Sequence, residues 1–158
     1  MAVEIERKFL VNIDKLPKLE NGVFFKQGYI PSSPGNVVRI RTAGEIAYIT
    51  IKGKTEGYSR LEYEYEIPVS DAEEMLEQLC LKPIISKVRY KIKFAGKIWE
   101  LDIFDLDNKG LYLAEIELEF EEESFEKPEW IGREVSHLKE YRNRFLADHP
   151  YRTWKKSY

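Results

Sequence analysis

Hydrophobic and polar residues alternate with a period of two over most of this chain. Because successive side chains of a strand point to opposite faces, this period predicts β-strands. We predict eight of them, at residues 3–11, 23–30, 37–42, 46–53, 60–68, 86–94, 97–104 and 111–121. Turn sequences separate these segments, and only the spacer around 70–85 is long enough for a parallel crossover. The sheet is therefore predicted to be mainly antiparallel.

Two segments have helical periodicity instead. SDAEEMLEQL (70–79) places its apolar residues on one stripe and begins with a capping-box pattern, Ser70 to Glu73. REVSHLKEYRNRFLA (133–147) also repeats apolar residues at helical spacing. We expect both amphipathic helices to cover apolar faces of the sheet. The basic, aromatic end of the chain, 151–158, is expected to be mobile or to pack on the surface.

Almost every predicted strand has one charged face and one apolar face. The usual reading of such a pattern is a half-buried sheet with its charges in water. Here the signs are segregated by strand, with bases at 87–93 and acids at 62–66 and 115–119. Like charges side by side cost stability unless opposite charge lies between them. We therefore predict an α+β, mainly antiparallel fold, a closed eight-stranded β-barrel with covering amphipathic helices and an inward-facing charged surface.

Composition limits the class of protein. A chain of 158 residues, 43% hydrophobic and 34% charged, is expected to form one folded domain, 1–158. Its net charge of -3 argues against a nucleic-acid partner. We expect no membrane partner, because no apolar run approaches the roughly 20 residues of a span. The charged N-terminal strand and the single cysteine, Cys80, favour a cytoplasmic protein without a signal peptide.

A charged lumen has chemical consequences. An eight-stranded barrel is wide enough to hold one small ligand. Acids and bases that line it cannot form a dry core, because buried charges need partners. A polyanion bound with a divalent metal ion satisfies both sets, since Lys and Arg bind phosphate and carboxylates bind Mg²⁺ or Mn²⁺. On the first strand, Glu4 and Glu6 are then predicted to hold metal and Lys8 to hold phosphate.

An ordered set of motifs resembles one family over nearly the whole chain. EIERK at 4–8 matches the E-x-E-x-K signature of the CYTH superfamily, the triphosphate tunnel metalloenzymes, and in particular its compact bacterial members. The match continues with VRIR, TIKG, EYEYEIP, KVRY, WELDIF, LAEIELE and WIGREV, at 38–41, 50–53, 62–68, 87–90, 99–104, 113–119 and 130–135. The resemblance implies an eight-stranded antiparallel tunnel and a divalent-metal cofactor, Mg²⁺ or Mn²⁺.

The resemblance also implies roles for individual residues. It implies metal ligands at Glu4, Glu6, Glu115 and Glu117, and further lumen carboxylates, as ligands or behind them, at Glu62, Glu64 and Asp102. It implies a phosphate cradle of Lys8, Arg39, Arg41, Lys52, Lys87 and Arg89. Tyr29 is implied to work with Lys8 in catalysis, although a lumen glutamate remains an alternative for proton handling.

The family contains several activities. We expect a metal-dependent triphosphatase that hydrolyses inorganic tripolyphosphate to pyrophosphate and phosphate. A thiamine triphosphatase and a class IV-type adenylate cyclase are alternatives, and a non-enzymatic polyphosphate- or nucleotide-binding module is a second alternative. The substrate is thus a small-molecule triphosphate, and a homodimer is left open.

Overall fold

The computed structural model describes residues 3–154 as one antiparallel sheet with few helices. Its strands are β1 (Val3–Val11), β2 (Val23–Ile30), β3 (Val37–Ala43), β4 (Ile46–Lys52), β5 (Ser59–Ile67), β6 (Ile85–Phe94), β7 (Lys97–Phe104), β8 (Tyr112–Glu117) and β9 (Ile131–Glu134). The helices are α1 (Val69–Gln78) and α2 (Asn143–Asp148), with short 3-10 turns η1 (Ile13–Lys15), η2 (Leu106–Asn108), η3 (Lys139–Tyr141) and η4 (Tyr151–Thr153).

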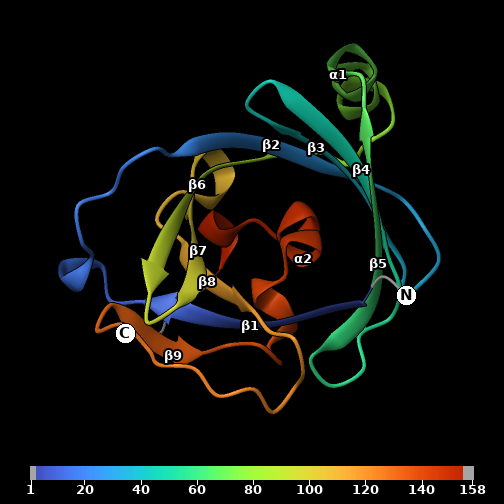
Figure 1. Cartoon of the computed structure of the whole chain (residues 1–158). Coiled ribbons are helices and arrows are strands. Elements are labelled where there is room, and N and C mark those ends of the chain that lie inside the picture. The colour runs from blue at the N-terminus through green and yellow to red at the C-terminus, as the bar shows by residue number, and fades with distance from the viewer. Residues whose placement is uncertain (1–2, 155–158) are drawn as a thin grey trace.

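Eight strands close into a barrel. The sheet order is β5-β4-β3-β2-β6-β7-β8-β1-β9, and β1 also pairs with β5, which joins the two ends of the eight-stranded part. Every pairing is antiparallel. Figure 1 shows the strands as a ring around an interior. The predicted closed eight-stranded antiparallel barrel is confirmed.

Strand β1 has different neighbours at its two ends. Its first residues, Val3 to Ile5, pair with β5, whereas Phe9 and Val11 pair with β9 across a register shift. β8 runs along the other edge of β1 from Glu6 to Leu10. β9 therefore takes over the edge of β1 where β5 no longer pairs with it, and it is a ninth strand that the periodicity did not predict.

The outer faces of the barrel are covered in two ways. Ala72 and Leu76 of α1 pack on Ile40 and Ala47 of the outer wall, as predicted for this helix. On the opposite side, Trp130 and neighbouring residues of the extended segment after β8 pack on Phe9, Trp99 and Ile116. β8 ends at Glu117 and not at 121, because the chain then leaves the sheet to form this cover.

The predicted helix at 133–147 is wrong. Its residues instead form the end of β9, η3 and the short helix α2. The predicted capping box at Ser70 is also wrong, because α1 begins after Pro68 and no side chain caps it. Both patterns are local, while β9 depends on backbone pairing with β1, more than a hundred residues away in sequence.

α2 does not cover the outside of the barrel but lies within the ring of strands (Figure 1). Leu146 and Ala147 are buried against apolar side chains from the inner wall, namely Tyr29, Ile85, Phe104 and Leu113. Tyr151 and Trp154 pack on the same cluster, so this part of the predicted surface end is attached to the core. Residues 155–158 of that prediction lie outside the described residues.

Candidate active site

The barrel encloses a cavity of about 710 Å³. It reaches from the loops after β2 and β4 to α2 and the inner strand faces. All the site residues predicted from the sequence line it except Asp102, namely Glu4, Glu6, Lys8, Tyr29, Arg39, Arg41, Lys52, Glu62, Glu64, Lys87, Arg89, Glu115 and Glu117. Alternation along the strands is the reason, because alternate residues of each strand face the lumen.

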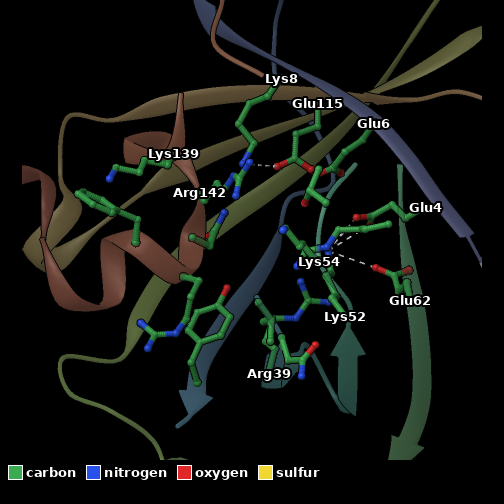
Figure 2. Close-up of a pocket in the computed structure, with 18 of the residues that line it drawn as sticks. Glu4, Glu6, Lys8, Arg39, Lys52, Lys54, Glu62, Glu115, Lys139 and Arg142 are labelled. Carbon is green, nitrogen blue, oxygen red and sulfur yellow. Dashed lines mark hydrogen bonds and ion pairs between the residues drawn. The ribbon is translucent and has the colours of Figure 1, made fainter. Parts of the chain in front are cut away.

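Lys52 connects carboxylates from two other strands. Its Nζ donates to both carboxylate oxygens of Glu4, at 3.0 and 3.2 Å, and lies 3.2 Å from Glu62 Oε2. Figure 2 shows these three side chains converging in the cavity. The β4–β5 register, in which Lys52 is opposite Glu62, brings the pair together.

Lys8 occupies a similar position beside Glu115. Its Nζ lies 3.3 Å from Glu115 Oε1 and donates to the carbonyl oxygen of Tyr141 at 3.0 Å (Figure 2 shows the pair with Glu115). The second bond ties the lysine to the segment that enters the barrel. Lys8 and Tyr29 share the cavity, but no direct hydrogen bond joins them within residues 3–154.

The pKa values of Glu6 and Glu115 are shifted in opposite directions, and the pKa of Glu4 is raised. Burial, together with Glu115 and Glu4, raises the pKa of Glu6 to about 8. Burial alone would also raise the pKa of Glu115, but Lys8, Arg89 and Lys87 hold it well below its usual value. The pKa of Glu4 is raised by burial and by the nearby Glu62, against the charge of Lys52. A proton on Glu6 thus neutralises part of the negative charge of this carboxylate cluster, as a bound cation would.

Arg39 and Arg41 lie side by side on β3, both almost fully buried. Arg39 donates to Thr50 Oγ1 at 3.1 Å and to Glu64 Oε2 at 3.3 Å. Its Nε is buried and has no acceptor among the described residues. A buried donor of this kind is costly unless an acceptor reaches it, and a phosphate oxygen in the cavity is such an acceptor.

Asp102 lies behind the cavity wall and contacts two of the predicted cradle residues. Arg89 donates to its two oxygens, from Nε at 2.7 Å and from Nη2 at 2.8 Å, and Lys87 Nζ lies 2.7 Å away. Burial would raise the pKa of Asp102, but the charges of Lys87 and Arg89 lower it to about 2. Burial lowers the pKa of Lys87 to about 7 despite Asp102. Asp102 therefore holds the side chains of Lys87 and Arg89 in place, and both of its oxygens already contact them.

The donor set of the cavity fits a hard divalent cation. It offers carboxylate oxygens in adjacent pairs, Glu6 with Glu115 and Glu4 with Glu62, and no thiolate. In residues 3–154 no three such side chains already stand together as a complete metal cluster. Glu4 and Glu115 are instead bonded to Lys52 and Lys8, so these lysines would have to release them toward a cation.

Several lining residues were not among the predicted site residues. Lys54, Arg60 and Glu100 lie on the charged faces, so the alternation pattern could have included them. Lys139, Arg142 and other residues from η3 and α2 also line the cavity; Figure 2 shows Lys139 and Arg142 on the segment that enters the barrel. No local pattern could have placed them there, because their segment was predicted to be an outer helix.

The fold and the cavity define the class of this protein: it is a closed antiparallel barrel whose interior is a site of paired acidic and basic side chains. The chain belongs to the CYTH family, because residues 2–146 match the model of the CYTH domain. No helix in the described part of the chain has the length and apolar character needed to span a bilayer.

Named relatives share most of their length with this chain. An inorganic triphosphatase of Acetivibrio thermocellus is 50% identical over 155 residues, 98% of this chain and 99% of that protein. An inorganic triphosphatase of Nitrosomonas europaea is 36% identical over 148 residues, 91% and 96% of the two chains. A crystal structure described as an inorganic triphosphatase has a TM-score of 0.66 at 35% identity, covering 93% of this chain and 95% of that one.

Proposed function

We propose that this chain is a metal-dependent triphosphatase that hydrolyses inorganic tripolyphosphate to pyrophosphate and phosphate. One observation carries the proposal: inside the cavity, basic side chains from several strands lie beside carboxylates from neighbouring strands. Relatives named inorganic triphosphatase, at 50% and 36% identity, support the same activity. The cavity of about 710 Å³ also has room for a short phosphate chain.

The basic residues bind and polarise the substrate in this proposal. Arg39, Arg41, Lys52, Lys87 and Arg89 would contact phosphate oxygens and stabilise the negative charge that moves to the leaving pyrophosphate. Arg39 Nε, which has no acceptor within residues 3–154, supplies one such contact. A water molecule attacks the terminal phosphorus as the bond to the bridging oxygen breaks.

The carboxylates would hold the metal. Glu4, Glu6, Glu115 and Glu117 are the proposed ligands, with Glu62 and Glu64 beside them in the cavity. When bound there, a divalent ion, Mg²⁺ or Mn²⁺, would neutralise phosphate charge and activate water. Glu6, whose pKa burial raises to about 8, would have to give up its proton to serve as a ligand.

Lys8 and Tyr29, which both line the cavity, are the proposed residues for proton handling. Lys8 donates to the carbonyl of Tyr141, so its ammonium group stays attached to this segment of the chain when Glu115 turns to the metal. Tyr29 presents a hydroxyl to the same cavity and is the second candidate. Asp102 is proposed to position Lys87 and Arg89 and not to bind metal, since its oxygens accept from both.

The test compares phosphate and pyrophosphate release from tripolyphosphate, thiamine triphosphate and ATP under one metal condition. We expect the highest kcat/KM for tripolyphosphate, because all three of its phosphates can enter the cradle. Activity should vanish with chelator, return with Mg²⁺ or Mn²⁺, and fall strongly in Glu117→Gln without loss of fold. Cyclic AMP from ATP would support a cyclase, preference for thiamine triphosphate would support that activity, and binding without turnover would support a non-enzymatic module.

A further inference from the structure

Gln27 of β2 has a fully buried side chain that touches three residues around the cavity. Its Oε1 accepts from Arg41 Nε at 2.9 Å, and its Nε2 donates to Tyr29 Oη at 2.9 Å and to Asn143 Oδ1 at 3.2 Å. The fold produces these contacts directly. Gln27 is opposite Arg41 in the β2–β3 register, and Tyr29 is two residues along on the same face.

Chemistry fixes the orientation of this amide. The Nε of an arginine can only donate, so the atom that it contacts on Gln27 must be the oxygen. The amide nitrogen then faces Tyr29 and Asn143. Asn143 Oδ1 also receives Lys87 Nζ at 3.0 Å, which agrees with an oxygen at that position.

This orientation decides where the Tyr29 hydroxyl hydrogen points. The phenol oxygen accepts a hydrogen from Gln27, so its own hydrogen must be donated in another direction. Within residues 3–154 the hydroxyl has no protein acceptor, and Tyr29 lines the cavity. The hydrogen is therefore available to a ligand in the lumen.

We infer that Gln27 is a positioning residue that turns the Tyr29 hydroxyl toward the bound triphosphate while it anchors Arg41. This inference rests on the proposed function, because it needs a phosphate oxygen beside Tyr29. One amide thus orients two donors toward the same substrate, the Tyr29 hydroxyl and the Arg41 guanidinium. Its link to Asn143 joins the same group to α2.

Gln27→Glu separates the two halves of this role. A carboxylate at this position still accepts from Arg41 but cannot donate to Tyr29, so the phenol would turn its hydrogen to the new carboxylate. Loss of one oriented donor to a developing charge lowers turnover, and we expect kcat for tripolyphosphate to fall roughly 10- to 100-fold. Gln78→Glu, the same change at an exposed position of α1, is the matched control and should leave kcat unchanged.

A double-mutant cycle with Tyr29→Phe distinguishes positioning from a structural role. If Gln27 acts through Tyr29, Gln27→Glu should change kcat by less than about twofold in the Tyr29→Phe background. Fully multiplicative losses in the double variant, or an unchanged kcat in Gln27→Glu alone, would overturn the inference. Thermal melting of each variant checks that the fold is retained.

A second readout does not depend on turnover. In protein labelled with ¹³C at the hydroxyl-bearing ring carbon of tyrosine, the Tyr29 resonance is identified by its loss in Tyr29→Phe. We expect Gln27→Glu to shift this resonance, and Gln78→Glu to leave it in place. An unmoved resonance overturns the inference, whereas absence of tripolyphosphate hydrolysis by the unaltered protein overturns the proposed function instead.

Discussion

Asp102 gives the most direct test of how the cavity wall is held together. The change is Asp102→Asn, which keeps the shape of the side chain and removes its charge. Asp102 is 1% exposed and Lys87 is 0% exposed, so neither can turn to water when the partner changes. The variant removes the carboxylate that Lys87 and Arg89 share, so that Lys87 loses its ion pair and Arg89 keeps its pair with Glu100.

The magnitude follows from two arguments that agree. Lowering the pKa of Asp102 from 3.8 to about 2 corresponds to about 2.5 kcal/mol of stabilisation, at about 1.36 kcal/mol for each pKa unit. Breaking a buried ion pair by removing one partner costs about 3–5 kcal/mol. Because Asn retains an oxygen that can accept from Arg89, we expect a loss of about 3 kcal/mol in the free energy of unfolding at pH 7.

The dependence on pH has a defined sign. The folded-state pKa lies below the unfolded one, so the stabilisation is present above about pH 4 and is lost as the pH falls toward 2. The difference between wild type and variant should therefore shrink by about half at pH 3. Urea unfolding at pH 7 and pH 3 measures it, with metal and substrate absent.

Asp148→Asn is the matched control. Asp148 pairs with Arg144 at 2.7 Å on α2, but both side chains are substantially exposed. Such surface pairs contribute about 0–1 kcal/mol, so this variant should resemble wild type. If Asp102→Asn lost less than about 1 kcal/mol at pH 7, or if its deficit did not shrink in acid, the reasoning from burial and charge would be refuted.

Two further variants probe the charge balance of the metal-free cavity. Glu6→Gln should raise the free energy of unfolding by about 4 kcal/mol at pH 8 and by about 1 kcal/mol at pH 5, because a folded pKa near 8 makes the wild type lose stability as the pH rises between those values. Urea unfolding in chelator measures this difference, with Glu66→Gln at the exposed end of β5 as control. Arg39→Ala should lower kcat/KM for tripolyphosphate strongly yet change the melting temperature little, since it also removes repulsion from Arg41; a large loss of stability with intact activity would make Arg39 structural.

The strands and the charged lumen could be predicted because both follow from a local rule. Alternation places Glu4, Glu6 and Lys8 on one face whatever lies beside them. Predicted and observed strand boundaries agree within one residue for most of the barrel. Acidic and basic residues lie on different strands, and this segregation favoured a charged face that points inward. Side chains of opposite charge on adjacent strands, such as Lys52 of β4 and Glu62 of β5, can then pair across the sheet.

The C-terminal segment could not be predicted by the same rule. Val135, Leu138 and Phe145 have helical spacing, yet their environments differ. Val135 is buried in the inner cluster, while Leu138 is 39% exposed. Their positions depend on β9 pairing with β1 and on the space left inside the barrel, both of which are long-range properties. The pairing of Asp102 with Lys87 and Arg89 could not be predicted either, because it depends on the β6–β7 register.

The position of β1 has a consequence for how this protein is made. β1 precedes all of its partners in the chain, and β5, β8 and β9 follow it as far along as Glu134. The pairing of β1 with β9 must therefore wait until the chain has been synthesised as far as Glu134, roughly 10 s at about 5–20 residues per second. Glu6 meets Glu115 and Glu117 only when β8 arrives. The charged residues that give β1 its role in the finished cavity also protect it, while it is unpaired, from joining strands of other chains.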